Sequence, residues 1–197
     1  MSAVKYTNRK GQVYYLHQGK TKTGKSKYYF SMKTGSNLVE AIPDGYEVYE
    51  NVNGQVFLIK EQPKAIIDDE LLLIEKRLGK IKGERSYRLD VKGNVITVHE
   101  SNENTRELRR MFEELSMYRS RQTTEGELLS LLDRSTSYTP MMRFILEDEE
   151  KRLFSVERYC FRGSVDDWIQ IGGAQHLKAI VEKFIPHLGR ESFFELF

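Results

Sequence analysis

The sequence has a single cysteine, Cys160, among its 197 residues. One cysteine cannot form a disulfide within the chain, and its β-type surroundings favour a small buried apolar side chain over a nucleophile. No apolar run approaches the roughly 20 residues that a membrane-spanning helix needs. The opening residues, MSAVKYTNRKGQ, lack the apolar core of a secretion signal. We therefore expect a cytoplasmic protein with no membrane partner.

Acidic residues are absent from residues 1–39. Eight lysines and arginines give this segment a charge of +8, whereas the rest of the chain carries −6, so the formal total is only +2. A charge split of this kind predicts an anionic partner for the basic end. That partner can be a nucleic acid, an acidic protein or the acidic remainder of the same chain.

Metal-ligand spacing is also lacking. The histidines are scattered, no pair of them is four residues apart, and the cysteine has no partner nearby in the sequence. We expect no metal centre, no cofactor and no catalytic residue, with the histidines acting as surface or capping groups. The four are His17, His99, His176 and His187.

The string GKTKTGKS, residues 19–26, matches the letters of a Walker phosphate loop. A phosphate loop requires a buried apolar strand before it and a helix after it, because the helix N-terminus faces the phosphate. Here the preceding QVYYLHQ is half polar and the following KYYFSMK has a strand pattern. The match is therefore interpreted as a coincidence of composition.

Apolar periodicity predicts an α+β fold whose first part is a small antiparallel module, residues 1–62. The runs GQVYYLH and SKYYFSMK are separated by a glycine-containing loop, which is typical of a β-hairpin. In the second run, Lys27, Tyr29, Ser31 and Lys33 alternate with Tyr28, Phe30 and Met32, which indicates one wet face and one packed face. Two further strands, IPDGYEVYE and QVFLIK, bring the predicted number to four and end near Gln62 and Pro63.

The remainder, residues 63–197, is predicted to be an α+β domain of antiparallel hairpins packed against helices. Helices are expected at 66–79, at 104–132 and at 174–188, where Pro186 favours an early end. The spacing of Ser192 and Glu195 predicts a capping box. A hairpin around residues 92–94 and the later runs MMRFILED, LFSVERYCF and DDWIQIGG supply the strands. No internal repeat is recognised.

The basic, aromatic segment at residues 5–33 is the strongest candidate for function. Cations attract phosphates through counterion release, and exposed aromatic rings stack on unpaired bases. A two-stranded ribbon can also enter the major groove of a DNA duplex. We therefore predict a non-enzymatic protein that binds DNA or RNA. The predicted contact residues are Arg9, Lys10, Lys20, Lys22, Lys25, Lys27, Tyr15 and Tyr29.

The same segment resembles the small three-stranded sheets that begin some recombinases and plant transcription factors. The shared features are KxGxxYY-like spacing in RKGQVYY and the KTGK of the hairpin loop. The resemblance covers about 30 residues. Lysine-rich hairpins also occur simply as solvated surfaces or as protection for edge strands, and that interpretation stays open.

Two other functions are compatible with the sequence. A protein-interaction adaptor can dock through the basic hairpin or through the apolar tail SFFELF, residues 192–197. A metal-dependent nuclease needs carboxylates that converge from strands, for which Glu157, Asp166 and Asp167 are the candidates. Adjacent residues of a strand point to opposite faces, which disfavours a shared ion at Asp166 and Asp167.

Overall fold

The structure, a computed structural model, describes residues 3–83, 85–118, 125–162 and 165–196. Within these ranges the fold is α+β, with three antiparallel sheets and four α-helices, as predicted. No helix in the same ranges is both long enough and apolar enough to cross a membrane.

The chain divides into two compact units. Unit 1 comprises Met1–Gln62 with Leu115–Thr136, and unit 2 comprises Pro63–Glu114 with Ser137–Phe197. Unit 2 also contains most of α2 (Thr105–Tyr118), and unit 1 contains α3 (Glu125–Ser135). The division into independent domains at residues 1–62 and 63–197 stays a prediction.

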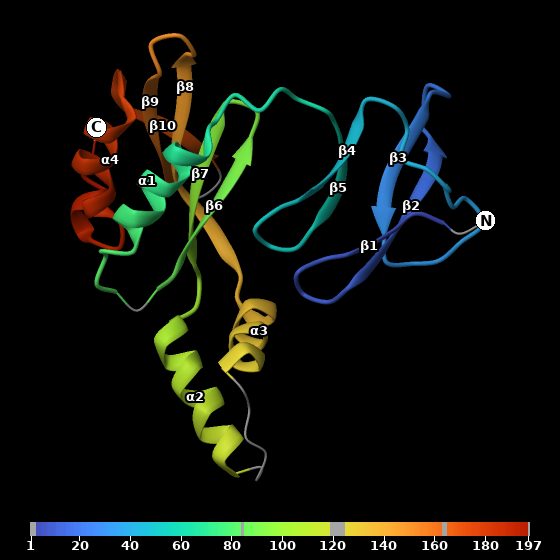
Figure 1. Cartoon of the computed structure of the whole chain (residues 1–197), viewed down its shortest axis with the longest axis horizontal. Coiled ribbons are helices and arrows are strands. Elements are labelled where there is room, and N and C mark those ends of the chain that lie inside the picture. The colour runs from blue at the N-terminus through green and yellow to red at the C-terminus, as the bar shows by residue number, and fades with distance from the viewer. Residues whose placement is uncertain (1–2, 84, 119–124, 163–164, 197) are drawn as a thin grey trace. The chain divides into compact units, whose positions relative to one another are not determined.

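Unit 1 is built on two small antiparallel sheets (Figure 1). The first contains β1 (Lys5–Thr7), β2 (Val13–Lys20) and β3 (Ser26–Ser31), with β2 in the middle. The second pairs β4 (Tyr46–Glu50) with β5 (Val56–Lys60). The predicted hairpin of β2 and β3 is confirmed. The predicted number of strands is too low, because β1 has only three residues and so carries almost no periodicity.

Three tight turns of unit 1 share one geometry. In Asn8–Gln12, Thr21–Lys25 and Asn51–Gln55, the first carbonyl accepts from the fourth N–H and the first N–H donates to the fifth carbonyl. The fourth residue is always a glycine with positive φ: Gly11 at 76°, Gly24 at 81° and Gly54 at 76°. Left-handed backbone of this kind closes a three-residue hairpin loop and favours glycine.

The turn geometry reveals a short internal repeat, so the expectation of no repeat is wrong. Residues 6–16, YTNRKGQVYYL, and residues 49–59, YENVNGQVFLI, share a tyrosine and the pattern NxxGQV. In both copies the asparagine side chain accepts from the backbone N–H of the glutamine, at 2.7 Å for Asn8 and 3.0 Å for Asn51. Its amide donates to the glutamine Oε1, at 2.9 Å to Gln12 and 2.8 Å to Gln55.

Unit 2 contains a five-stranded antiparallel sheet in the order β10-β9-β8-β7-β6. Its strands are β6 (Tyr87–Lys92), β7 (Val95–Ser101), β8 (Tyr138–Asp148), β9 (Leu153–Arg162) and β10 (Val165–His176). Helices α1 (Asp68–Leu78) and α4 (Leu177–Phe184) lie on the same side of this sheet (Figure 1). The core between them is apolar and includes the fully buried side chains of Ile74, Ile96, Val98, Met142, Phe144, Phe154 and Val156.

The end of the chain departs in two ways from the pattern predicted by the sequence. Strand β10 continues to His176, so α4 begins three residues later than 174. Pro186 lies in a 3₁₀ turn, Ile185–His187, which follows α4 and confirms the early end of the helix. The predicted capping box is wrong: the 3₁₀ turn Glu191–Phe193 has no side-chain cap, and Ser192 is 2.9 Å from Nδ1 of His187 instead.

Candidate nucleic-acid interface

The loop between β2 and β3 carries an exposed cluster of lysines, which we call the basic tip: Lys20, Lys22, Lys25 and Lys27. The backbone of the loop is fixed by the Thr21–Lys25 turn, in which the Lys25 N–H also donates to the Thr21 hydroxyl at 3.1 Å. None of the four ammonium groups lies at ion-pair distance from a carboxylate in the described ranges. Their charge is therefore available to an external anion.

The register of the sheet gathers aromatic and cationic groups on one face, which we call the open face: Lys5, Tyr15, His17, Lys27 and Tyr29. Tyr15 lies opposite Lys5, and His17 lies opposite Tyr29. Because directly paired residues of an antiparallel sheet point the same way, these side chains share one surface. The Lys5 ammonium is 5.8 Å from the centre of the Tyr15 ring.

Tyr29 is the most accessible ring of the open face, with 41% of its surface exposed. One side of the ring stacks on His17, with centroids 5.3 Å apart and planes 11° apart. The ring also lies over Gly19, where a Cβ would be only 3.3 Å from the Tyr29 Cε1 atom. The absence of a side chain at Gly19 thus leaves room for the tyrosine, which presents a flat surface to solvent.

The opposite face of the same sheet is the packed face. Leu16 is fully buried there and pairs with Phe30, while Tyr28 packs near Tyr46 with ring centroids 6.4 Å apart. The predicted alternation is confirmed at Tyr28, Tyr29 and Phe30, whereas Met32, which was predicted for the packed face, is 55% exposed. Lys20 belongs by register to the packed side and Lys27 to the open side, so the basic tip presents cations around the end of the ribbon rather than on one surface.

The structure separates Arg9 and Lys10 from the lysines of the basic tip. Both lie in the Asn8–Gln12 turn, at the other end of β2 from the basic tip. The eight residues of β2 span about 26 Å at the usual strand rise.

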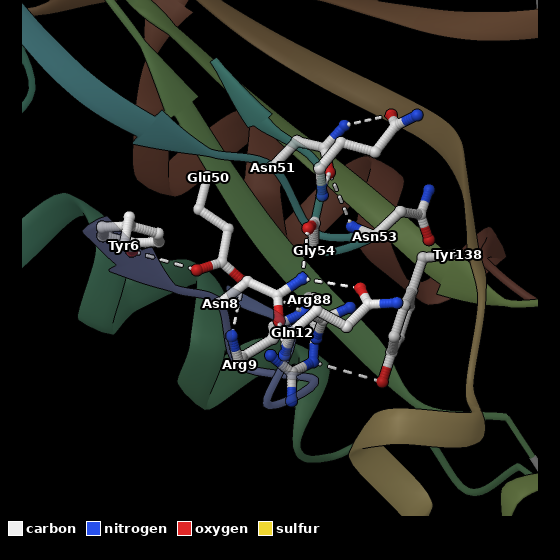
Figure 2. Close-up of polar contacts among 11 residues, drawn as sticks. Tyr6, Asn8, Arg9, Gln12, Glu50, Asn51, Asn53, Gly54, Arg88 and Tyr138 are labelled. Atoms are coloured by element: carbon white, nitrogen blue, oxygen red, sulfur yellow. Dashed lines mark hydrogen bonds and ion pairs between the residues drawn. The ribbon is translucent and has the colours of Figure 1, made fainter. Parts of the chain in front are cut away.

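Arg9 and Lys10 are held in place by contacts with Glu50 and with the Asn51–Gln55 turn. Glu50 accepts from the Arg9 backbone N–H at 2.9 Å, and its Oε1 lies 3.9 Å from the Arg9 Nε (Figure 2). Lys10 is only half-exposed, and its stem lies against Gly54. Both residues join the two hairpins of unit 1.

Further hydrogen bonds in the same place show how the two hairpins of unit 1 are held together. The Asn8 amide donates to the Gly54 carbonyl at 2.6 Å, and the Tyr6 hydroxyl donates to Glu50 at 3.0 Å (Figure 2). Burial, and then the hydrogen bond to Glu50, raises the pKa of Tyr6 above its ordinary value. The neutral phenol is therefore the stable donor. The contacts between the two hairpins of unit 1 thus have a structural role.

The Walker-like string GKTKTGKS forms the end of β2, the loop and the start of β3. No helix follows it, because Ser26 begins a strand. His17, which precedes the string, is buried and lies 2.9 Å from the Lys33 carbonyl through its Nε2. The segment is a β-hairpin, as its apolar pattern predicts.

The carboxylates proposed for a nuclease do not converge in the described part of unit 2. Asp167 pairs with Cys160 and Glu157 pairs with Gln170, which places Asp167 and Glu157 on opposite faces of the sheet. Glu157 also forms an ion pair with Arg143. The side chain of Asp166 lies outside the described residues. Cys160 is buried, as expected for a small apolar residue.

The C-terminal tail is held on unit 2. Phe193 is fully buried in the core. Arg158, a buried residue of β9, donates from Nε to the Leu196 carbonyl at 2.7 Å and from Nη2 to the Phe194 carbonyl at 3.3 Å. The carbonyls of Phe194 and Leu196 are therefore already engaged, and among the described apolar side chains of the tail Phe193 is buried, Leu196 is half-buried and Phe194 is 55% exposed.

No protein-family model, no curated protein sequence and no solved structure matches this chain. Six of the eight predicted contact residues lie on the basic tip or the open face, namely Lys20, Lys22, Lys25, Lys27, Tyr15 and Tyr29. Lys5 joins them although the sequence pattern did not indicate it, because its position depends on the short strand β1.

Proposed function

We propose that this chain binds single-stranded nucleic acid along the open face and the basic tip of the β1–β2–β3 sheet. The observation that supports the proposal is the coincidence of four exposed ammonium groups, which form no ion pair with any described residue, with an exposed tyrosine on the adjoining face. Lysines supply sequence-independent attraction to phosphates, and a tyrosine ring stacks on any base.

The order of groups along the sheet fits a strand that runs across it. Lys27 comes first, the exposed Tyr29 ring follows two residues further on β3, and the Tyr15–Lys5 pair lies beyond it. Cations thus lie at both ends of the two rings, where they can contact phosphates while the rings stack on the bases between them. A duplex offers its phosphates to the basic tip but keeps its bases stacked and out of reach of Tyr29.

The first test is the salt dependence of binding. Fluorescence anisotropy with labelled oligonucleotides of about 15 nucleotides, as single-stranded DNA, single-stranded RNA and duplex, compares the three classes directly. With about four phosphate contacts, the affinity for a single strand is expected to fall roughly 50-fold between about 50 and 200 mM salt. An affinity that does not change with salt, or the absence of binding at the lower concentration, contradicts the proposal.

The Tyr29→Leu substitution tests the stacking contact separately from charge. Loss of one base–ring stack, about 1–3 kcal/mol, is expected to weaken single-strand binding about tenfold, while the affinity for duplex stays unchanged. Leucine keeps an apolar cover over His17, so the sheet is retained. Phe57→Leu is the matched control, since Phe57 is an equally exposed ring (43%) on β5. If the two substitutions weaken binding equally, Tyr29 does not contact the nucleic acid.

A further inference from the structure

Unit 2 contains a cavity of about 570 Å³ that no step of the proposed nucleic-acid binding uses. It lies between the segment that precedes β6, the end of β7 and the C-terminal residues 188–194. Its volume falls within the roughly 300–1,000 Å³ of pockets that bind small molecules. Most of its lining comes from two stretches about 100 residues apart in the sequence.

The apolar part of the lining is formed by core residues. Met141, Leu188 and Phe193 are buried and contribute side chains that the fold has already ordered. Phe194 is 55% exposed and meets Phe193 edge to face, with ring centroids 5.4 Å apart. A ligand with an apolar body therefore covers an exposed ring and contacts a rigid, preformed surface.

A buried carboxylate, Glu100, contributes the polar part of the lining, and its charge is already balanced. Its side chain is 5% exposed; Oε1 accepts from the Tyr87 hydroxyl at 2.8 Å and Oε2 accepts from Arg85 Nη1 at 2.8 Å. Burial, and then the hydrogen bond to Glu100, raises the pKa of Tyr87, which keeps the phenol neutral and donating. Glu100 is thus satisfied by the protein and does not require a cationic ligand.

The chain passes this cluster closely because of Gly189. Its φ is 73°, and a Cβ at this position would be 3.0 Å from the Tyr87 hydroxyl oxygen. A glycine in the left-handed region lets the backbone turn from Leu188 to Arg190 without filling the cavity. The space beside Tyr87 and Glu100 is consequently kept open by the sequence itself.

Among the described lining residues, the remaining charges are predominantly positive. Lys82 and Arg190 are exposed and take part in no ion pair within the described residues, and Glu191 is the one other acid among the lining residues. With the Arg85–Glu100 pair balanced, these three side chains leave a net charge of +1 beside an apolar wall. An anionic head group with an apolar body satisfies both parts of the cavity.

We propose that this cavity binds a small amphipathic anion, in which a carboxylate or phosphate group contacts Lys82 and Arg190 and an apolar body lies against Met141, Phe193 and Phe194. This site shares no residue with the nucleic-acid interface, because all of its residues belong to unit 2 and the basic tip belongs to unit 1.

Four probes with the same alkyl chain test the chemistry of the head group: octanoate, octyl phosphate, octanol and octylammonium. The protein labelled with ¹³C at its methionine methyl groups reports the location, since Met141 lines the cavity whereas Met32 and Met111 are exposed elsewhere. Octanoate or octyl phosphate is expected to shift the Met141 resonance to saturation and to leave those of Met32 and Met111 in place. The anion that binds more tightly distinguishes a carboxylate ligand from a phosphate ligand.

The double substitution Lys82→Glu/Arg190→Glu is expected to weaken anion binding at least tenfold, because each removes a hydrogen bond to a charged group. Lys76→Glu/Lys178→Glu makes the same change of charge on exposed residues of α1 and α4 outside the cavity and is the control. Tighter binding of octylammonium, equal binding of octanol, an unshifted Met141 resonance, or equal effects of the two double substitutions overturns the proposal.

Discussion

Replacement of Lys20, Lys22, Lys25 and Lys27 by glutamine is expected to lower the affinity for single-stranded nucleic acid at least about 100-fold at low salt, and to make the remaining affinity nearly independent of salt. The physical reason is counterion release: each ammonium that neutralises a phosphate frees a condensed cation, and four contacts are lost together. Anisotropy titrations at several salt concentrations measure both the affinity and its slope.

The same substitutions should leave the fold intact. All four lysines are exposed, and none forms an ion pair within the described part of the chain. Exposed side chains without partners contribute little to stability. The thermal midpoint and the circular dichroism spectrum are therefore expected to match those of the parent protein.

A control variant separates a local site from the general effect of net charge. It carries Lys64→Gln, Lys76→Gln, Lys80→Gln and Lys178→Gln, which remove the same four charges from exposed positions of unit 2. If this variant loses as much affinity as the tip variant, binding follows the total charge of the chain and the basic tip is not a site.

The largest effect on stability is expected for Arg152→Met in unit 2. Arg152 forms hydrogen bonds to both carboxylate oxygens of Glu70, at 2.9 Å from Nε and 2.6 Å from Nη2, and a third to the Ala65 carbonyl at 3.0 Å. The Glu70 side chain is only 10% exposed. Removal of the arginine leaves this carboxylate buried without its cation, which costs about 3 kcal/mol, the lower end of the usual range because Arg152 itself is partly exposed.

The chain's one tryptophan gives a direct measurement of this effect. Trp168 lies on β10, so its fluorescence during urea denaturation reports the unfolding of unit 2. Lys151→Met is the matched control: Lys151 is the neighbouring residue, 73% of its side chain is exposed, and it pairs with Asp148 at 3.5 Å. Loss of such a surface pair changes the free energy of unfolding by less than about 1 kcal/mol.

The double substitution Glu70→Gln/Arg152→Met distinguishes charge from packing. Glutamine keeps the oxygen that accepts from the Ile67 backbone N–H, now 3.1 Å away, but removes the unpaired charge. The double variant should recover most of the stability lost by Arg152→Met. If it is as unstable as the single variant, the arginine acts through the packing of its stem and not through the ion pair.

Local sequence patterns were sufficient to predict most helices and strands of the fold. Alternation at Tyr28, Tyr29 and Phe30 predicted both the strand and its packed face, because the two sides of a strand have different surroundings. Helix α1 was predicted from its acidic first turn and its final glycine, which are local features of helix ends. The short strand β1 and the extension of β10 to His176 were not predicted, since both depend on hydrogen bonds to partner strands.

For the candidate sites, too, some features follow from the sequence alone and others only from the tertiary structure. The excess of cations near residues 20–27 is a property of the sequence, and so is the prediction of an anionic partner. The sequence by itself determined the α+β class, the hairpin and the concentration of charge, because these depend on residue type and on spacing along the chain.

Only the tertiary structure decided which cations are available. It paired Arg9 with Glu50, and among the described residues it gave the basic tip no ion pair. It also placed Lys5 beside Tyr15 and bound the tail to Arg158. It also assembled the cavity beside Glu100 from two distant stretches of the chain. The physical reason is that hydrogen bonds, ion pairs and cavities depend on the distances between atoms, and folding brings together groups that the sequence keeps tens of residues apart.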